Sequence, residues 1–209
     1  MIIIGVCGGT ASGKSTLSRE IINFFDNKEI KSDYLMLDNY YKDLGHLSIK
    51  QRALVNFDHP DSIDFKLFYQ HLKLLRIGKL VNTPTYCYKT HLRKHITNPV
   101  GKSNVLVIDG LFILFKKNIR NFFDLTIFLD VDVNLRIKRR IKRDLVERGR
   151  KKLDVLERFE KMINPMHGEF VEPTKKYANL LFKDYVQHDL LFQELELLFD
   201  EIINKNKKQ

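Results

Sequence analysis

A glycine-rich segment near the start of the chain, residues 8–16, restricts the fold more than any other feature. It matches the pattern G-x-x-x-x-G-K-[ST]. Glycines let successive backbone N–H groups turn inward toward a phosphate, the lysine reaches the β- and γ-phosphates, and the serine hydroxyl binds Mg²⁺. The pattern therefore predicts a nucleotide phosphate site and a magnesium ligand. The predicted site comprises Gly8, Gly9, Thr10, Ala11, Ser12, Gly13, Lys14, Ser15 and Thr16.

The residues on either side of this loop supply the structural context that the pattern requires. Residues 1–6 form an apolar, β-branched run that predicts a buried strand. Leu17, Ile21 and Phe25 recur at helical spacing after the loop, and they predict a helix with one apolar face. A strand, a loop and a helix thus follow in order, so the helix N-terminus can add its dipole to phosphate binding.

Further apolar strands predict the rest of the fold. The run 104–108 ends at Asp109, and the run 125–129 ends at Asp130. Apolar strands separated by helices are typical of a parallel sheet that is covered on both faces. We therefore expect an α/β chain with the P-loop nucleoside triphosphate hydrolase fold. With 209 residues, of which 44% are hydrophobic, we expect one domain, residues 1–209.

Composition excludes several other classes of protein. The two cysteines have no disulfide or metal spacing, the apolar N-terminal run is too short for a signal peptide, and no apolar run approaches the roughly 20 residues of a membrane span. We expect a cytoplasmic protein with no membrane association.

The positive charge is concentrated in one window. The net charge is +10, and residues 136–152 contain ten Lys/Arg and two acids, which leaves +8 in that window. Arg136, Arg140 and Arg143 share one helical face, and Gly149 ends the pattern. A local cluster of this kind suits a triphosphate better than a nucleic acid, so we expect an arginine-rich helical lid over about 136–152 and no nucleic-acid partner. A solvated basic helix is the alternative.

Three further segments carry candidate acceptor-site residues. Asp38 follows a short apolar strand at 34–37, so it is a candidate general base or Mg²⁺ ligand, although a helix-capping or turn role is equally open. Asp58 lies in a polar segment and could accept hydrogen bonds from sugar hydroxyls, or could lie in a solvated loop. Residues 81–97 predict a β-hairpin whose Tyr86, Tyr88 and His91 could stack on a base, or could simply pack.

Together these stretches resemble the uridine kinases (uridine–cytidine kinases) of the phosphoribulokinase/uridine kinase group, from Ile4 to about Tyr177. The strings that carry the resemblance are Gly9–Ser15, Asp38–Lys42, Asn56–Asp61, Pro84–Tyr86 with His91 and Arg93, Asp109–Gly110, Arg139–Asp144 with Glu147–Arg150, and Pro173–Tyr177.

The resemblance implies transfer of the γ-phosphoryl group of ATP or GTP to the 5′-hydroxyl of uridine or cytidine, giving UMP or CMP, with Mg²⁺. It also implies a homotetramer. It assigns catalysis to Asp38 as general base and to Lys14, Arg143 and Arg148; nucleotide binding to the glycine-rich loop and Arg140; nucleoside binding to Tyr41, Asp58, Tyr86, Tyr88, His91, Arg140 and Arg148; and metal binding to Ser15, Asp38 and Asp109.

The chain departs from the family pattern at three places. Asp109 stands where the family usually has glutamate, which shortens the acid by one methylene. Tyr86-Cys87-Tyr88 stands for Tyr-Asp-Phe, which removes a carboxylate and adds a hydroxyl near the base pocket. Arg158 stands where the family often has a glutamine that contacts the nucleoside. The last two bear on substrate preference.

Other functions remain open on the sequence. A related kinase could act on phosphoribulose, pantothenate or nicotinamide riboside. A GTPase switch is less consistent, because Asn27-Lys28 is followed by Glu29-Ile30 rather than by x-Asp. A nucleic-acid-dependent ATPase would bind nucleic acid with strong salt dependence. A non-catalytic nucleotide-binding scaffold is disfavoured by the presence of Lys14 and Asp38.

Overall fold

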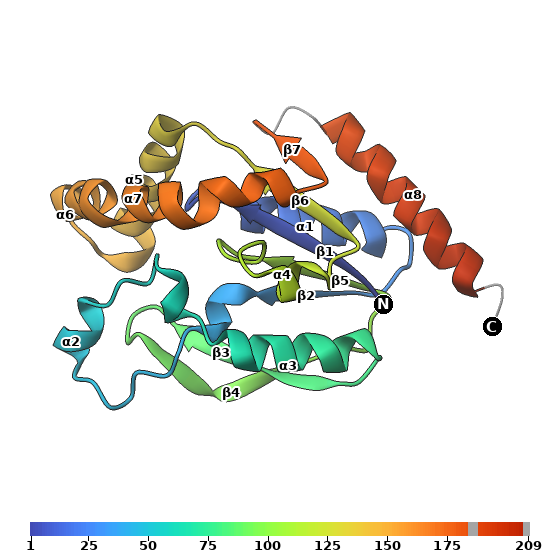
Figure 1. Cartoon of the computed structure of the whole chain (residues 1–209), viewed down its shortest axis with the longest axis horizontal. Helices are drawn as coiled ribbons and strands as arrows, with labels where there is room; N and C mark the ends of the chain where they lie inside the picture. Colours follow the sequence, from blue (N-terminus) through green and yellow to red (C-terminus); the bar gives the residue numbers. More distant parts are fainter. Residues whose placement is uncertain (184–187, 207–209) are drawn as a thin grey trace.

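A computed structural model, which describes residues 1–183 and 188–206, contains a five-stranded sheet in the order β2-β5-β1-β6-β7 (Figure 1). All four neighbouring pairs are parallel. The strands are β1 Ile2–Gly8, β2 Ser32–Met36, β5 Val105–Asp109, β6 Leu125–Leu129 and β7 Leu180–Phe182. The predicted parallel α/β sheet is confirmed.

The central strand β1 is buried on both of its faces, so the sheet needs a covering layer on each side. All seven of its residues are buried, and successive side chains point to opposite faces. Ile3 and Cys7 join one apolar cluster, whereas Ile4 and Val6 join a second. A strand buried on both sides reads as a continuous apolar run, which is the pattern that residues 1–6 show.

Helices supply the two covering layers. Helix α1 (Lys14–Asp26) buries Leu17, Ile21 and Phe25 as its sequence predicts, and α8 (His188–Asn206) packs in the same cluster. Helix α3 (Phe65–Arg76) packs in the other cluster, next to β3. Two short helices, α2 (Ile49–Ala53) and α4 (Lys117–Arg120), lie in the connections. No helix in the described residues has the length and apolarity to cross a membrane.

The predicted hairpin forms a separate two-stranded antiparallel sheet of β3 (Val81–Cys87) and β4 (Leu92–Val100). It extends three residues beyond the predicted end at residue 97. Figure 1 shows it beside α3. Arg93 fixes the hairpin to the main domain body, because its Nε donates to the Tyr41 carbonyl at 2.8 Å and its Nη2 contacts the Asp64 carboxylate at 3.2 Å.

The arginine-rich window forms two helices. Helix α5 (Val133–Arg148) ends at Gly149, whose φ of 63° lies in the left-handed region that glycine adopts without strain. Helix α6 (Lys152–Arg158) begins four residues after the end of α5, and the helical path continues through Phe159–Ile163, α7 (Asn164–Met166) and His167–Val171. The predicted lid at 136–152 is therefore most of α5, its glycine end and the first residue of α6.

The strand predicted at 34–37 is wrong in its limits. Strand β2 ends at Met36, and Leu37–Tyr40 form a 3₁₀ turn. Asp38 thus lies in this turn rather than directly at the end of the strand. The turn still leaves Asp38 at the carboxyl edge of the sheet, where parallel sheets place their ligands.

Candidate active site

A cavity of about 1360 Å³ opens at the carboxyl edge of the sheet, between the glycine-rich loop, the hairpin and α5. The predicted residues that line it are Thr10, Ala11, Gly13, Lys14, Ser15, Thr16, Asp38, Tyr41, Asp58, Tyr86, Tyr88, His91, Asp109, Arg140 and Arg143. Gly8, Gly9 and Ser12 belong to the same loop. Arg148 ends α5, and its side chain lies outside the described part of the structure.

The glycine-rich loop has the backbone that its sequence predicts. Gly8 and Gly13 have φ angles of 141° and 103°, which L-residues with a side chain rarely adopt. The Lys14 ammonium donates to the Gly9 carbonyl at 2.8 Å, across the mouth of the loop. Burial lowers the pKa of Lys14, while Asp109 and Asp38 act in the opposite direction. A phosphate in this loop would give that buried ammonium a closer anionic partner.

An acidic side chain from β5 faces the start of α1. Asp109 Oδ2 accepts hydrogen bonds from the Ser15 hydroxyl at 2.7 Å and from the Tyr34 hydroxyl at 2.9 Å. Burial raises the pKa of Asp109, and the Ser15 hydrogen bond opposes that shift. The shortened acid therefore still reaches the serine of the loop. Sequence reasoning missed Tyr34, because a tyrosine on a strand carries no local signal of its partner.

The oxygen atoms of Ser15 and Asp109 fit Mg²⁺, a hard cation that keeps water and phosphate among its ligands. Among the described residues, no group of three or more His, Cys, Asp or Glu side chains could enclose a metal ion. A magnesium ion here would accordingly depend on the nucleotide phosphates for much of its coordination. Asp38, which the sequence also suggests as a ligand, accepts a hydrogen bond from the Tyr88 hydroxyl at 3.3 Å, and its role as a metal ligand stays a prediction.

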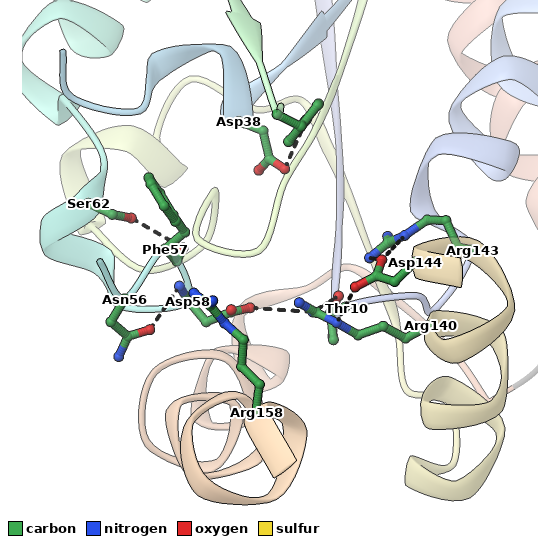
Figure 2. Close-up of polar contacts among 12 residues, drawn as sticks. Thr10, Asp38, Asn56, Phe57, Asp58, Ser62, Arg140, Arg143, Asp144 and Arg158 are labelled. Atoms are coloured by element: carbon green, nitrogen blue, oxygen red, sulfur yellow. Dashed lines mark hydrogen bonds and ion pairs between the residues drawn. The ribbon is translucent and has the colours of Figure 1, made fainter. Parts of the chain in front are cut away.

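The cavity has a phosphate side, formed by the glycine-rich loop, and an acceptor side, formed by Asp58 and the hairpin. Arg140 contacts both sides (Figure 2). Its Nη1 donates to Thr10 Oγ1 at 2.7 Å and lies 3.8 Å from Asp58 Oδ1. The arginine is 5% exposed and Asp58 is 9% exposed, so this contact is screened little by solvent. The predicted nucleotide-binding arginine and the predicted sugar-binding carboxylate are thus direct neighbours.

A buried carboxylate organises the arginines of α5. Asp144 is fully buried, and its oxygen atoms lie 2.9 Å from Arg143 Nη2, 3.5 Å from Arg140 Nε and 3.6 Å from Arg150 Nη1. Figure 2 shows Asp144 between Arg140 and Arg143. Holding three cations close together needs such an anion, because like charges in a partly buried site repel. Sequence reasoning counted Asp144 only as a charge to be subtracted.

Aromatic rings line the acceptor side. Phe57 stacks on His91 with ring centroids 4.7 Å apart at 12°, and Tyr41 packs against Tyr86 at 5.0 Å. The Tyr86 hydroxyl bonds to His91 Nδ1 at 3.4 Å, and His91 has a left-handed φ of 54°. Phe57 was not predicted as a site residue, although it belongs to Asn56–Asp61, one of the strings that carry the resemblance.

Arg136 does not join the cationic face that the helical spacing predicts. It is 4% exposed, its Nε donates to the Val131 carbonyl at 3.0 Å, and it is absent from the cavity lining. A Cβ on Gly9 would lie 2.3 Å from Arg136 Nη1, so the guanidinium packs directly behind the phosphate loop. The first arginine of α5 therefore points inward, against the phosphate loop.

His167 gives folding a predictable pH dependence. Burial, with Arg136 nearby, lowers the pKa of His167 from 6.5 to about 4. Between these values the unfolded chain binds more protons at this site than the folded chain, so stability falls as the pH falls from about 6.5 toward 4. We expect His167→Gln to reduce the loss of unfolding free energy between pH 7.5 and pH 5, measured by urea denaturation. The exposed His46→Gln is the control, and an unchanged pH dependence in His167→Gln would contradict the assignment.

Comparisons with known proteins agree with this geometry. The phosphoribulokinase/uridine kinase family model matches residues 3–190. A uridine kinase from Clostridium novyi (strain NT) is 38% identical over 209 residues, covering 99% of this chain and 98% of the relative. A uridine kinase from Chloroflexus aurantiacus is 42% identical over 87% of this chain and 86% of the relative.

Among solved structures, phosphoribulokinase from Rhodobacter spheroides aligns with a TM-score of 0.66 at 16% identity, over 87% of this chain and 69% of that one. That likeness shows the α/β fold of P-loop kinases. The family model spans the glycine-rich loop, the hairpin and the arginine-rich helices alike. The chain therefore belongs to the phosphoribulokinase/uridine kinase family.

Proposed function

We propose that this protein is a kinase that transfers the γ-phosphoryl group of ATP or GTP to the 5′-hydroxyl of uridine or cytidine, giving UMP or CMP. The observation that carries the proposal is one cavity that joins the phosphate loop to Asp38 and to an aromatic pocket. The extended similarity to uridine kinases supports the choice of acceptor.

The phosphate side holds the donor nucleotide. Backbone N–H groups of residues 8–16 and the Lys14 ammonium bind the β- and γ-phosphates. Arg140 and Arg143 approach from α5, and Arg148 completes that helix. Fixed cations of this kind stabilise the charge that spreads over the transferred group, in a cavity from which bound substrates displace water.

Ser15 and Asp109 would hold Mg²⁺ on the same side. When bound, the ion would neutralise part of the negative charge on the phosphates. Asp109 accepts hydrogen bonds from the Ser15 and Tyr34 hydroxyls, which aim the carboxylate at the phosphate loop.

The acceptor side binds and activates the nucleoside. Asp38 takes the proton of the 5′-hydroxyl, and Asp58 accepts hydrogen bonds from the ribose hydroxyls. The pyrimidine ring lies among the aromatic side chains, where stacking contributes binding energy. The side chains proposed to line this pocket are Tyr41, Tyr86, Tyr88 and His91, together with Phe57.

The Tyr88 hydroxyl donates a hydrogen bond to Oδ2 of Asp38, the proposed base, at 3.3 Å. The hydroxyl is absent from the phenylalanine that the family usually carries. We expect Tyr88→Phe to lower kcat about fivefold, the effect of about 1 kcal/mol for one hydrogen bond that orients the base, with the KM for ATP unchanged. Steady-state kinetics with Tyr69→Phe on α3 as control would measure this. A change in the KM for ATP with kcat intact would contradict it.

The acceptor is tested by a coupled assay of nucleoside diphosphate release with ATP or GTP and Mg²⁺. The panel contains uridine, cytidine, adenosine, ribulose 5-phosphate, pantothenate and nicotinamide riboside. Turnover with uridine or cytidine supports the proposal. Turnover with only one of the other acceptors favours the related-kinase alternative. Release of nucleoside diphosphate that occurs only after nucleic acid is added favours the ATPase alternative.

We also propose an assembly and a cellular setting for this protein. The chain acts as one domain, in the cytoplasm, without nucleic-acid or membrane partners, and the resemblance favours a homotetramer. Light scattering on the purified protein across a concentration series measures the assembly. A mass of one 24.7 kDa chain at all concentrations would reject the oligomer.

A further inference from the structure

Arg158, at the end of α6, reaches across the cavity to the segment that carries Asp58 (Figure 2). Its Nη1 donates to the Ala53 carbonyl at 3.2 Å, and its Nη2 donates to the Val55 carbonyl at 3.1 Å. A glutamine at this position would offer a single NH₂ group on a shorter side chain, whereas the guanidinium spans two carbonyls with a fixed fork. The departure from the family residue therefore adds a bridge between two elements.

The part of the bridged segment that precedes Phe57 has few apolar contacts. Helix α2, directly before it, contributes no buried residue, and Leu54 is 80% exposed. Residues with few buried apolar contacts open locally at low cost in free energy. The two charge-assisted hydrogen bonds from Arg158 stand in for the missing core contacts, because bonds to a charged donor are stronger than neutral ones.

The segment ends in the residues that face the acceptor. Asn56 Oδ1 accepts from the Asp58 N–H at 3.1 Å, and the Ser62 hydroxyl donates to the Phe57 carbonyl at 3.2 Å. Phe57 then stacks on His91, and the Asp58 carboxylate faces Arg140. A shift of the Ala53 and Val55 carbonyls would therefore displace both Phe57 and Asp58.

We propose that Arg158 is a positioning residue that clamps residues 53–58 against α6 and so sets the places of Phe57 and Asp58. Only residues 149–151 separate α5 from α6, and Arg140 on α5 and Arg158 on α6 both contact this segment. The shape of the acceptor pocket is then tied to the placement of the arginine-rich helices. The inference rests on the proposed function for its kinetic consequence only.

The kinetic test compares Arg158→Ala, Arg158→Lys and the control Lys161→Ala, whose side chain is exposed on the same helical path and pairs with Glu157. We expect Arg158→Ala to raise the KM for uridine about tenfold, the loss of roughly one charge-assisted hydrogen bond, with the KM for ATP changed less than about twofold. Arg158→Lys should recover part of the loss, because its ammonium can donate to one carbonyl. An unchanged KM for uridine, or equal rises for both substrates, would overturn the clamp.

A second measurement does not need activity. Trypsin cleaves after Arg52, next to the clamped carbonyl of Ala53, and cleavage there requires the segment to open. We expect trypsin to cleave the Arg52–Ala53 bond at least about fivefold faster in Arg158→Ala than in wild type and in Lys161→Ala. Cleavage is measured by mass spectrometry on protein without added ligand. Thermal unfolding of each variant checks the fold, and Arg158→Lys serves if Arg158→Ala does not fold.

The two readouts separate the two proposals. Faster cleavage in the variant, together with no turnover of uridine or cytidine by wild type, would retain the clamp and reject the proposed acceptor. Turnover of uridine by wild type, with equal cleavage rates in wild type and variants, would retain the function and overturn the clamp.

Discussion

Asp38→Asn is expected to lower kcat for uridine by about 1,000-fold, within the range typical of a positioned general base. The amide has the size of the carboxylate but cannot take the proton of the acceptor hydroxyl. The KM values for uridine and ATP should change little, because the phosphate loop and the aromatic pocket are untouched. Single-turnover assays with quench at millisecond to minute times would measure the chemical step.

Asp43→Asn is the matched control, since Asp43 is an exposed aspartate five residues away whose Oδ1 accepts a hydrogen bond from the nearby Gly45 N–H. Its kcat should equal that of wild type. If Asp38→Asn retained more than about a tenth of the wild-type kcat, Asp38 would not be the base, and the loss would be no larger than that of an orienting hydrogen bond.

Asp144→Asn is expected to destabilise the fold by about 3–5 kcal/mol, the cost of breaking a buried ion pair by removing one partner. Asp144 is fully buried, and the guanidinium groups of Arg140, Arg143 and Arg150 lie within 3.6 Å of it. Without its charge the three cations repel one another with no anion between them. Urea denaturation followed by circular dichroism gives the free energy of unfolding.

The arginines would also lose their placement, so kcat should fall together with stability. Asp154→Asn, an exposed acid in the first turn of α6, controls for loss of a carboxylate from this region and should unfold within about 0.5 kcal/mol of wild type. Equal stability of Asp144→Asn and wild type would show that the arginines are held by other contacts.

Much of this architecture is encoded by local patterns. The phosphate loop needs glycines, a lysine and a serine at fixed spacing, and in the structure Gly8 and Gly13 have the positive φ angles that glycine adopts without strain. The apolar runs that end at Asp109 and Leu129 are buried strands because a parallel sheet hides both faces. Such features depend on neighbours in sequence, so they can be read from the chain alone.

The remaining site features depend on contacts between distant segments. Arg158 bonds to Ala53 and Val55, about 100 residues earlier, and no periodicity links them. Tyr34 meets Asp109 only because β2 and β5 are neighbours in the sheet. Asp144 differs, because its spacing of four from Arg140 is a local signal that could have indicated a helical ion pair, whereas its complete burial has no local signal.

The order of strands in the sheet also bears on how the chain folds during synthesis. The central strand β1 is made before both of its partners: Ile2 pairs with Val105, and Ile4 pairs with Leu125. An apolar strand that waits for more than about a hundred residues is exposed to aggregation and is slow to find its register. At a synthesis rate of about 5–20 residues per second, that interval lasts about 5 to 20 seconds. A ribosome-bound chain truncated before residue 105 should therefore lack the sheet and bind chaperones that recognise apolar segments.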